Sequence, residues 1–84
     1  MSADEAFLRH LLGGIVLQPE RMRFERTEDG RGILFRIHLA KPDMPLVIGK
    51  AGQSIKALRL IMNMHAKDGP AISLKLEEPD QRTV

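Results

Sequence analysis

The sequence predicts a small α+β domain in which three helices pack on one face of a three-stranded sheet. Three observations support this prediction. The chain has 84 residues, which suits one hydrophobic core. Apolar residues recur at helical spacing in two long segments, and three shorter segments alternate apolar with polar residues. In chain order the segments read helix, strand, strand, helix, helix, strand (αββααβ).

The opening segment is predicted to be an amphipathic helix. Ser2 and Glu5 have the spacing of a capping box. The apolar residues that follow fall on one face: Phe7, Leu8, Leu11, Leu12, Ile15 and Val16. The Gly13-Gly14 pair costs the helix about 1–2 kcal/mol relative to alanines, so we expect it to bend or fray there. Pro19 is expected to end it.

Two alternating segments are predicted to form a β-hairpin. Met22, Phe24 and Arg26 alternate with polar residues, and Ile33–Ala40 places Ile33, Phe35, Ile37 and Leu39 on one face. The Asp29-Gly30 dipeptide between them is typical of a turn. A third strand is predicted from Ile72, Leu74 and Leu76, and a two-helix crossover lets it join the sheet in parallel.

The crossover is predicted to contain a short helix and a long one. Pro42-Asp43 suits the start of the short helix, which reaches Ile48. The long helix is expected from Gln53 to Lys67, where Gly69-Pro70 stops it. Its core-facing residues are predicted to be Ile55, Leu58, Ile61, Met62 and Ala66. Residues 1–77 then form a single domain, and residues 78–84 a disordered tail.

Positive charge is concentrated in one part of the chain. The net charge is +2, but residues 31–67 carry seven basic and one acidic side chain, a net charge of +6. Such a patch fits a polyanionic partner, and the alternative is a solvated basic helix face. The sequence has no cysteine and no apolar run long enough to span a membrane. We therefore expect a cytoplasmic protein.

The basic region surrounds a glycine turn that precedes the long helix. Gly49 and Gly52 bracket Lys50 and Ala51, and the helix follows at once. Unpaired first-turn N–H groups and the helix dipole favour an anion at that position. Glycine permits a tight turn and a close approach of the ligand. We interpret this turn as a phosphate-binding site.

The stretch around this turn reads Val-Ile-Gly-Lys-Ala-Gly-Gln-Ser-Ile-Lys-Ala-Leu (residues 47–58). It resembles the signature of the K-homology (KH) RNA-binding domain, a Gly-x-x-Gly loop between two helices. The helix and strand before the βααβ unit are similar to the type II arrangement. The whole chain resembles the small bacterial KH proteins of the KhpA family, over about residues 3–77.

The resemblance implies binding of about four nucleotides of single-stranded RNA beside the loop. Gly49, Lys50, Ala51 and Gly52, with Gln53 and Ser54 at the helix start, would hold the RNA backbone. Val47, Ile48 and Ile55 would form an apolar groove wall, or alternatively core. Lys56 and Arg59 would reach phosphates or a base edge, or alternatively remain solvated.

Two departures from the family pattern affect the expected partners. Pro45 and Leu46 stand where relatives commonly have a small and then a basic residue, which removes a charge and exposes a leucine. Leu60 and Met64 are unusually apolar for an outward helix face. Because the family is expected to self-associate and to pair with a larger RNA-binding protein, KhpB, we predict that Leu60 and Met64 form a homodimer contact. The alternative is that they pack under the opening helix.

Other features exclude several kinds of chemistry. The three aromatic residues, Phe7, Phe24 and Phe35, all fall at core positions, so base stacking is largely absent and micromolar or weaker affinity is expected. The glycine turn lacks the spacing of a Walker loop, and His10, His38 and His65 form no metal-ligand pattern. We predict no enzyme, cofactor or metal. The two hypotheses are an RNA chaperone or adaptor, and a protein-interaction module with little RNA affinity.

Overall fold

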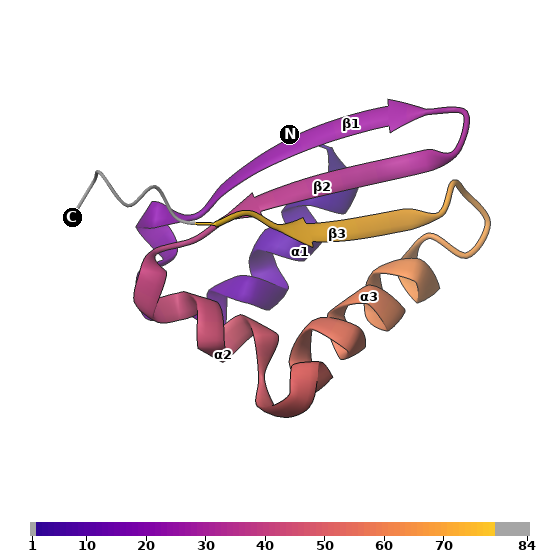
Figure 1. Ribbon diagram of the computed structural model, residues 1–84. Helices are drawn as coiled ribbons and strands as arrows, with labels where there is room; N and C mark the ends of the chain where they lie inside the picture. Colours follow the sequence, from indigo (N-terminus) through magenta and orange to yellow (C-terminus); the bar gives the residue numbers. More distant parts are fainter. Residues whose placement is uncertain (1, 79–84) are drawn as a thin grey trace.

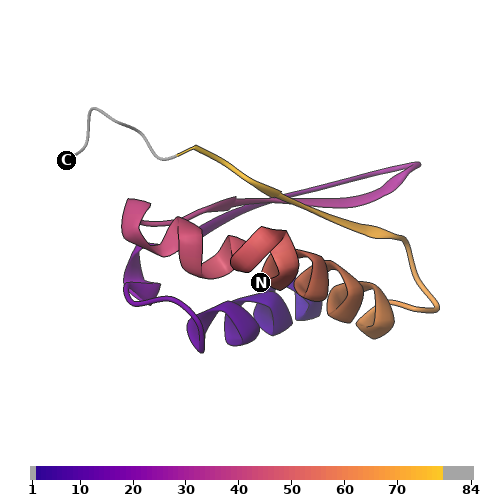
Figure 2. The ribbon, with the colours of Figure 1, turned by 60° about the horizontal axis from the view of Figure 1, so that its bottom comes forward.

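The computed structural model describes residues 2–78 and confirms the two-layer α+β architecture (Figure 1). Its helices are α1 (Ala3–Gly13), α2 (Met44–Ile48) and α3 (Gln53–His65), and its strands are β1 (Arg23–Asp29), β2 (Gly32–His38) and β3 (Ile72–Leu76). Single 3-10 turns lie at Pro19–Arg21, Lys41–Asp43 and Lys50–Gly52. Figure 2 shows all three helices on one side of the sheet. Within the described residues the other face is open.

The sheet has the predicted topology, with strand order β1-β2-β3. β1 and β2 pair antiparallel across a turn at Gly30 and Arg31, and β2 pairs with β3 in parallel. Gly32, with φ 134°, allows this arrangement, because a Cβ there would lie 2.3 Å from the backbone oxygen of Ala71. The residue before β3 therefore lies close beside the start of β2, where the Ile33 N–H donates to that oxygen at 2.8 Å.

The hydrophobic core lies between the sheet and the helices. Alternate residues of β2 and β3 face it, as the period-two pattern predicts. The buried cluster comprises Leu8, Leu12, Val16, Met22, Ile33, Phe35, Ile37, Leu39, Val47, Ile55, Leu58, Met62, Ile72 and Leu74. Since each buried large apolar side chain contributes about 1.5–3 kcal/mol, this cluster is the main source of stability.

The first helix begins as predicted and ends earlier than predicted. The Ser2 hydroxyl accepts a hydrogen bond from the Glu5 N–H at 3.1 Å, which caps α1. The helix stops at Gly13, well before Pro19, and Gly14 is its C-terminal cap. The expectation that Pro19 ends the helix is thus wrong, because the two glycines already do so.

A buried carboxylate joins the segment after α1 to the start of α2. Asp43 is fully buried, and its Oδ1 and Oδ2 accept hydrogen bonds from the N–H groups of Leu17 (2.9 Å) and Gln18 (3.1 Å). Carboxylates that accept backbone N–H bonds are held strongly. Asp43 therefore positions the short helix that leads into the glycine turn.

The long helix α3 starts at Gln53 as predicted and ends at His65, two residues before Lys67. Ile55, Leu58 and Met62 face the core as predicted, and Ala66 packs against it. Ile61 is 38% exposed, so the prediction that it faces the core is wrong. Leu60 and Met64 are 63% and 64% exposed, so the alternative that they pack under α1 is wrong.

Two kinds of feature are absent from the part of the chain that the structure describes. Between residues 2 and 78, no helix has the length and apolarity needed to cross a membrane. The same residues contain no cluster of three or more metal-ligating side chains. Residues 79–84 of the predicted tail lie outside the described residues.

Candidate nucleic-acid interface

The Gly49–Gly52 turn connects the C-terminus of α2 to the N-terminus of α3, at the lower corner of the ribbon in Figure 1. The Gly49 N–H donates to the Pro45 oxygen at 2.9 Å and closes α2, and the Gly52 N–H donates to the Gly49 oxygen at 3.2 Å. Three of the four residues have positive φ: Gly49 (76°), Ala51 (55°) and Gly52 (75°). The turn is thus tight and defined by its own backbone hydrogen bonds.

The two glycines are needed for different reasons. A Cβ on Gly49 would lie 2.3 Å from the hydroxyl oxygen of Ser54 and 2.9 Å from its backbone nitrogen. A Cβ on Gly52 would meet only the flexible end of Lys56, at 4.0 Å. Gly49 therefore allows close packing against α3, whereas Gly52 is required only for its left-handed backbone.

Ala51 stores strain in the turn. Among residues 2–78 it is the one non-glycine residue with positive φ, and its ψ is 26°. An L-residue in the left-handed helical region costs about 1–2 kcal/mol. Such strain is typical of ligand-binding turns, where the surrounding structure imposes the conformation.

The N-terminus of α3 carries no side-chain cap within the described structure. Its N-cap is Gly52, which has no side chain to accept a hydrogen bond. The Ser54 hydroxyl lies against Gly49. A helix of 13 residues therefore presents its positive end at the turn. Lys50 and Gln53 are exposed beside it, so the corner is suited to an anion.

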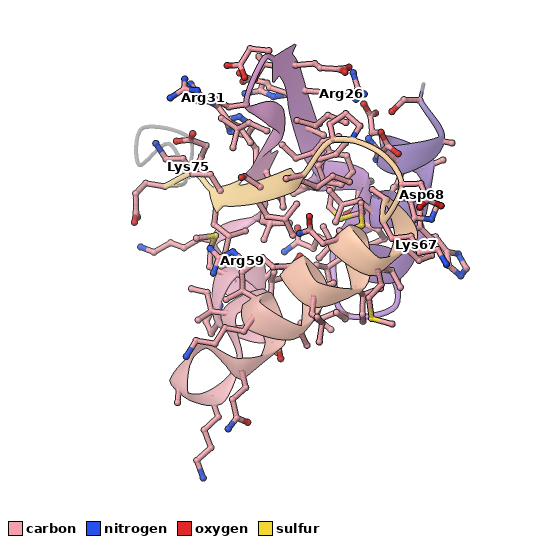
Figure 3. The ribbon with its side chains drawn as sticks, turned by 90° about the vertical axis from the view of Figure 1, so that its right-hand side faces the viewer. Arg26, Arg31, Arg59, Lys67, Asp68 and Lys75 are labelled. Atoms are coloured by element: carbon pink, nitrogen blue, oxygen red, sulfur yellow. The ribbon has the colours of Figure 1, made fainter. Side chains whose placement is uncertain are left out.

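Two further predicted cations lie one and two turns into α3. Lys56 is exposed. Arg59 is also exposed, and its Nη2 donates to the Leu74 oxygen at 3.3 Å. Figure 3 shows Arg59 between α3 and β3. Arg59 is therefore not merely solvated, because one of its donors is bonded to the outer edge of β3.

The three predicted groove-wall residues have different environments. Val47 is fully buried and Ile55 is 7% exposed, so the burial favours the core alternative for both. Ile48 is 37% exposed and has apolar surface to offer beside the turn. Leu46 is exposed as well, as the sequence departure at that position predicts.

Sequence reasoning missed Asn63. Its Nδ2 donates to the oxygens of Arg59 (2.8 Å) and Ile72 (2.9 Å), and its Oδ1 accepts from the Ile72 N–H at 2.9 Å. The side chain thus joins α3 to the free edge of β3. The sequence feature that could have predicted this contact is a polar amide on the side of a helix that packs beside an edge strand. The outward backbone groups of an edge strand need hydrogen-bond partners.

The chain is similar to known proteins over most of its length. Residues 5–77 match the family model described as the KhpA/KhpB KH domain. RNA-binding protein KhpA of Chlamydia pneumoniae is 32% identical over 73 residues, which cover 86% of this chain and 94% of that protein. RNA-binding protein KhpA of Thermotoga maritima is 33% identical over 70 residues, covering 82% and 92%. RNA-binding protein KhpA of Mycobacterium tuberculosis strain H37Rv is 33% identical over 55 residues, covering 66% and 69%.

Proposed function

This chain belongs to the KhpA/KhpB family of KH domains, and on that premise we propose that it binds single-stranded RNA at the Gly49–Gly52 turn. One observation supports the site above all others: the N-terminus of α3 has no side-chain cap, and Lys50 is exposed beside it. The turn that precedes this N-terminus contains two glycines with positive φ. Backbone N–H groups, the helix dipole and an ammonium group converge there on one anion-sized position.

In the proposed complex, one phosphate of the RNA lies against the first turn of α3. Ser54 and Gln53 begin the same helix turn, so the Ser54 hydroxyl and the Gln53 side chain are proposed to contact that phosphate together with Lys50. About four nucleotides follow the groove from the turn along α3. Lys56 contacts a further phosphate, Ile48 packs against a base, and Arg59, already bonded to Leu74, presents its remaining donors to the strand.

The proposed affinity is modest. Base stacking is absent from this site, because Phe35 is buried, Phe7 and Phe24 pack against the core, and the chain has no tyrosine or tryptophan. Binding then depends on phosphate contacts, with dissociation constants on the order of micromolar or weaker. With roughly three phosphate contacts, the logarithm of the affinity falls with the logarithm of salt concentration at a slope of about −2. Such weak, sequence-tolerant binding suits an RNA chaperone or adaptor in the bacterial cytoplasm.

Charge reversal at the turn tests this function. In the double variant Lys50→Asp/Ala51→Asp two carboxylates face the phosphate, and aspartate tolerates the left-handed conformation of residue 51 better than alanine does. We expect RNA binding, measured by fluorescence anisotropy, to be lost while the circular dichroism spectrum is unchanged. Lys67→Asp/Ala3→Asp is the matched control, because it changes the net charge equally at two exposed positions on other parts of the chain. RNA affinity that is equal in the two variants would refute the proposal.

A second candidate function is association with another protein. Leu60 and Met64, with the partly exposed Ile61, form an apolar strip on the outward side of α3. We propose that this strip is a homodimer contact, and that it also serves a larger KhpB-type partner. Light scattering on Leu60→Glu/Met64→Glu is expected to show a monomer where the parent chain is a dimer. An unaltered mass, or a monomeric parent, would contradict this contact.

A further inference from the structure

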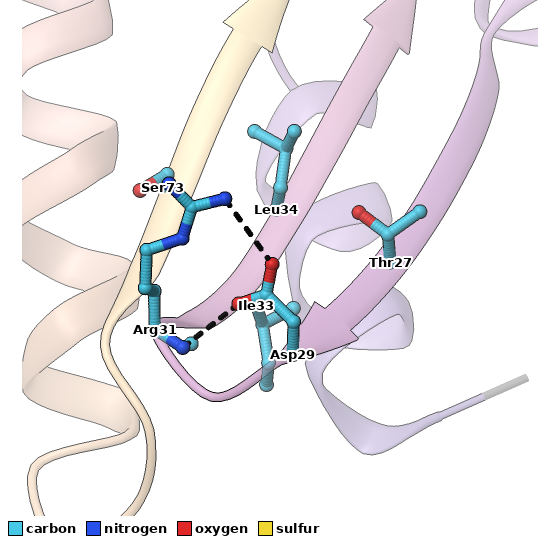
Figure 4. Close-up of a pocket in the computed structure, with 7 residues that line it drawn as sticks. Thr27, Asp29, Arg31, Ile33, Leu34 and Ser73 are labelled. Atoms are coloured by element: carbon cyan, nitrogen blue, oxygen red, sulfur yellow. Dashed lines mark hydrogen bonds and ion pairs between the residues drawn. The ribbon is translucent and has the colours of Figure 1, made fainter.

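The open face of the sheet contains a pocket near the β1-β2 turn (Figure 4). In Figure 1 this turn lies away from the corner between α2 and α3. Its volume is about 270 Å³. Thr27 on β1, Leu34 on β2 and Ser73 on β3 are register neighbours and form its floor, while Asp29 and Arg31 stand at one end. This volume is just below the range of about 300–1,000 Å³ of ordinary small-molecule sites. The pocket therefore suits one ring system of a larger ligand.

The floor of this pocket is uncharged on a face that is otherwise highly charged. Leu34 is the single apolar residue that the three strands place on the open face, and a hydroxyl flanks it on either side. The row spans about 10 Å across three strands. The Arg31 guanidinium is 93% exposed, and its backbone N–H donates to Asp29 at 2.8 Å. A planar cation therefore stands beside an uncharged floor with one apolar side chain at its centre, an arrangement that accepts an unstacked base.

The next row along the strands holds two cations directly opposite each other. Arg36 on β2 and Lys75 on β3 are register partners. Both lie near the same oxygen of Glu77, Arg36 at 3.8 Å and Lys75 at 4.0 Å, which is too far for hydrogen bonds. Glu25, the neighbour of Arg36 on β1, pairs with His38 and Arg23 instead.

Like charges opposite each other destabilise a sheet. Because Arg36 and Lys75 share only the distant carboxylate of Glu77, a net positive charge remains next to the uncharged floor of the pocket. At the other end of the pocket Asp29 neutralises Arg31. These charges favour one orientation of a bound nucleotide, with its base at Leu34 and its phosphate at Arg36 and Lys75.

These groups lie on the side of the molecule that the proposed RNA would reach. In Figure 3, Arg59, Lys75 and Arg31 follow one another up the same side, whereas Arg26 and Lys67 lie on the opposite side. The outer edge of β3 separates the groove from the open face. An RNA strand that leaves the groove past Arg59 would cross the edge of β3 next to Lys75.

We propose that the open sheet face is a second nucleotide-binding site, in which one base lies on Thr27, Leu34 and Ser73 and the adjoining phosphate binds Arg36 and Lys75. This inference rests on the proposed function in one respect: it extends the path of the same RNA beyond the groove. The nucleotide itself, whether free or part of a strand, is recognised by the same groups.

The test compares a tetranucleotide, which fills only the groove, with a dodecanucleotide of the same base. For Arg36→Gln/Lys75→Gln we expect the affinity for the dodecanucleotide to fall about tenfold. Its salt slope should become shallower by about 0.7, the value for one phosphate contact on a single strand, while tetranucleotide binding is unchanged. Arg21→Gln/Lys67→Gln is the control with equal net charge. Equal losses in both variants, or no loss in either, would overturn the proposal.

Methyl NMR of Leu34 separates this site from the glycine turn. We expect its signals to shift with the dodecanucleotide and not with the tetranucleotide. In Lys50→Asp/Ala51→Asp they should still shift with millimolar uridine monophosphate. If neither the dodecanucleotide nor uridine monophosphate shifts the Leu34 signals, the pocket does not bind nucleotides. If only uridine monophosphate shifts them, the proposed path of the RNA across the sheet is wrong. Failure of the tetranucleotide to bind the parent chain instead overturns the function proposed for the turn.

Discussion

The side-chain amide of Asn63 on α3 forms two hydrogen bonds with the backbone of Ile72 on β3, one in each direction and both of 2.9 Å. Ile72 N–H and C=O point away from β2, at the free edge of the sheet, and Asn63 supplies the partners that a fourth strand would otherwise supply. Arg59 does the same for the Leu74 oxygen. These hydrogen bonds hold α3 and β3 together beside the proposed path of the RNA.

Removing this amide is expected to destabilise the domain. In Asn63→Ala the edge groups of Ile72 lose their partners, which costs about 2 kcal/mol of unfolding free energy. Urea denaturation measures this change. Lys67→Ala, at an exposed position just after α3, is the control and should change stability by less than about 0.5 kcal/mol. Similar values for both variants would show that the two hydrogen bonds contribute little.

The glycine turn should respond unequally to the same substitution at its two ends. Gly52→Ala must adopt a positive φ without a clash, and we expect a loss of about 1 kcal/mol. Gly49→Ala adds overlap with Ser54, so a loss of about 2–4 kcal/mol is expected. Thermal unfolding of both variants tests the order. Replacing Ser54 by alanine should rescue Gly49→Ala only in part, because the Ser54 Cβ and backbone nitrogen also lie within 3 Å.

Relieving the strain at Ala51 should stabilise the chain. In Ala51→Gly the left-handed conformation no longer carries a penalty of about 1–2 kcal/mol, while glycine loses about 0.5–1 kcal/mol through backbone entropy. We expect a net gain of about 0.5–1 kcal/mol in chemical denaturation, with RNA affinity within twofold of the parent. A destabilised variant would mean that the alanine methyl group makes a favourable contact.

Asp43 is expected to be the most sensitive polar position of the fold. Asp43→Ala removes both acceptors from the Leu17 and Gln18 N–H groups and leaves a small cavity, at a cost of about 3 kcal/mol. Glu20→Ala, at an exposed residue of the same connection, serves as the control. Hydrogen exchange at Leu17 and Gln18 should accelerate in Asp43→Ala alone. Protection that persists there would show that other contacts hold this segment.

The element order and most of the core could be predicted from the sequence, because both depend on local periodicity. Ile33, Phe35 and Ile37 alternate in β2, and Ile55, Leu58 and Met62 recur at helical spacing in α3. The predicted end of α1 at Pro19 is too late, because Gly13 and Gly14 end the helix before the proline is reached. The glycine turn was found as a motif, but the separate roles of Gly49 and Gly52 depend on what surrounds them.

Patterns of neighbouring residues thus suffice to predict the strands, the helices, the crossover and the position of the glycine turn, since backbone sterics and hydrophobic spacing act within a few residues. Asp43 with Leu17, Asn63 with Ile72, and Arg36 opposite Lys75 are contacts between residues 26, 9 and 39 positions apart. Only the packed structure selects these partners, because the fold as a whole establishes hydrogen-bond geometry and strand register. The residues next to each of these positions do not determine which distant group will lie beside it.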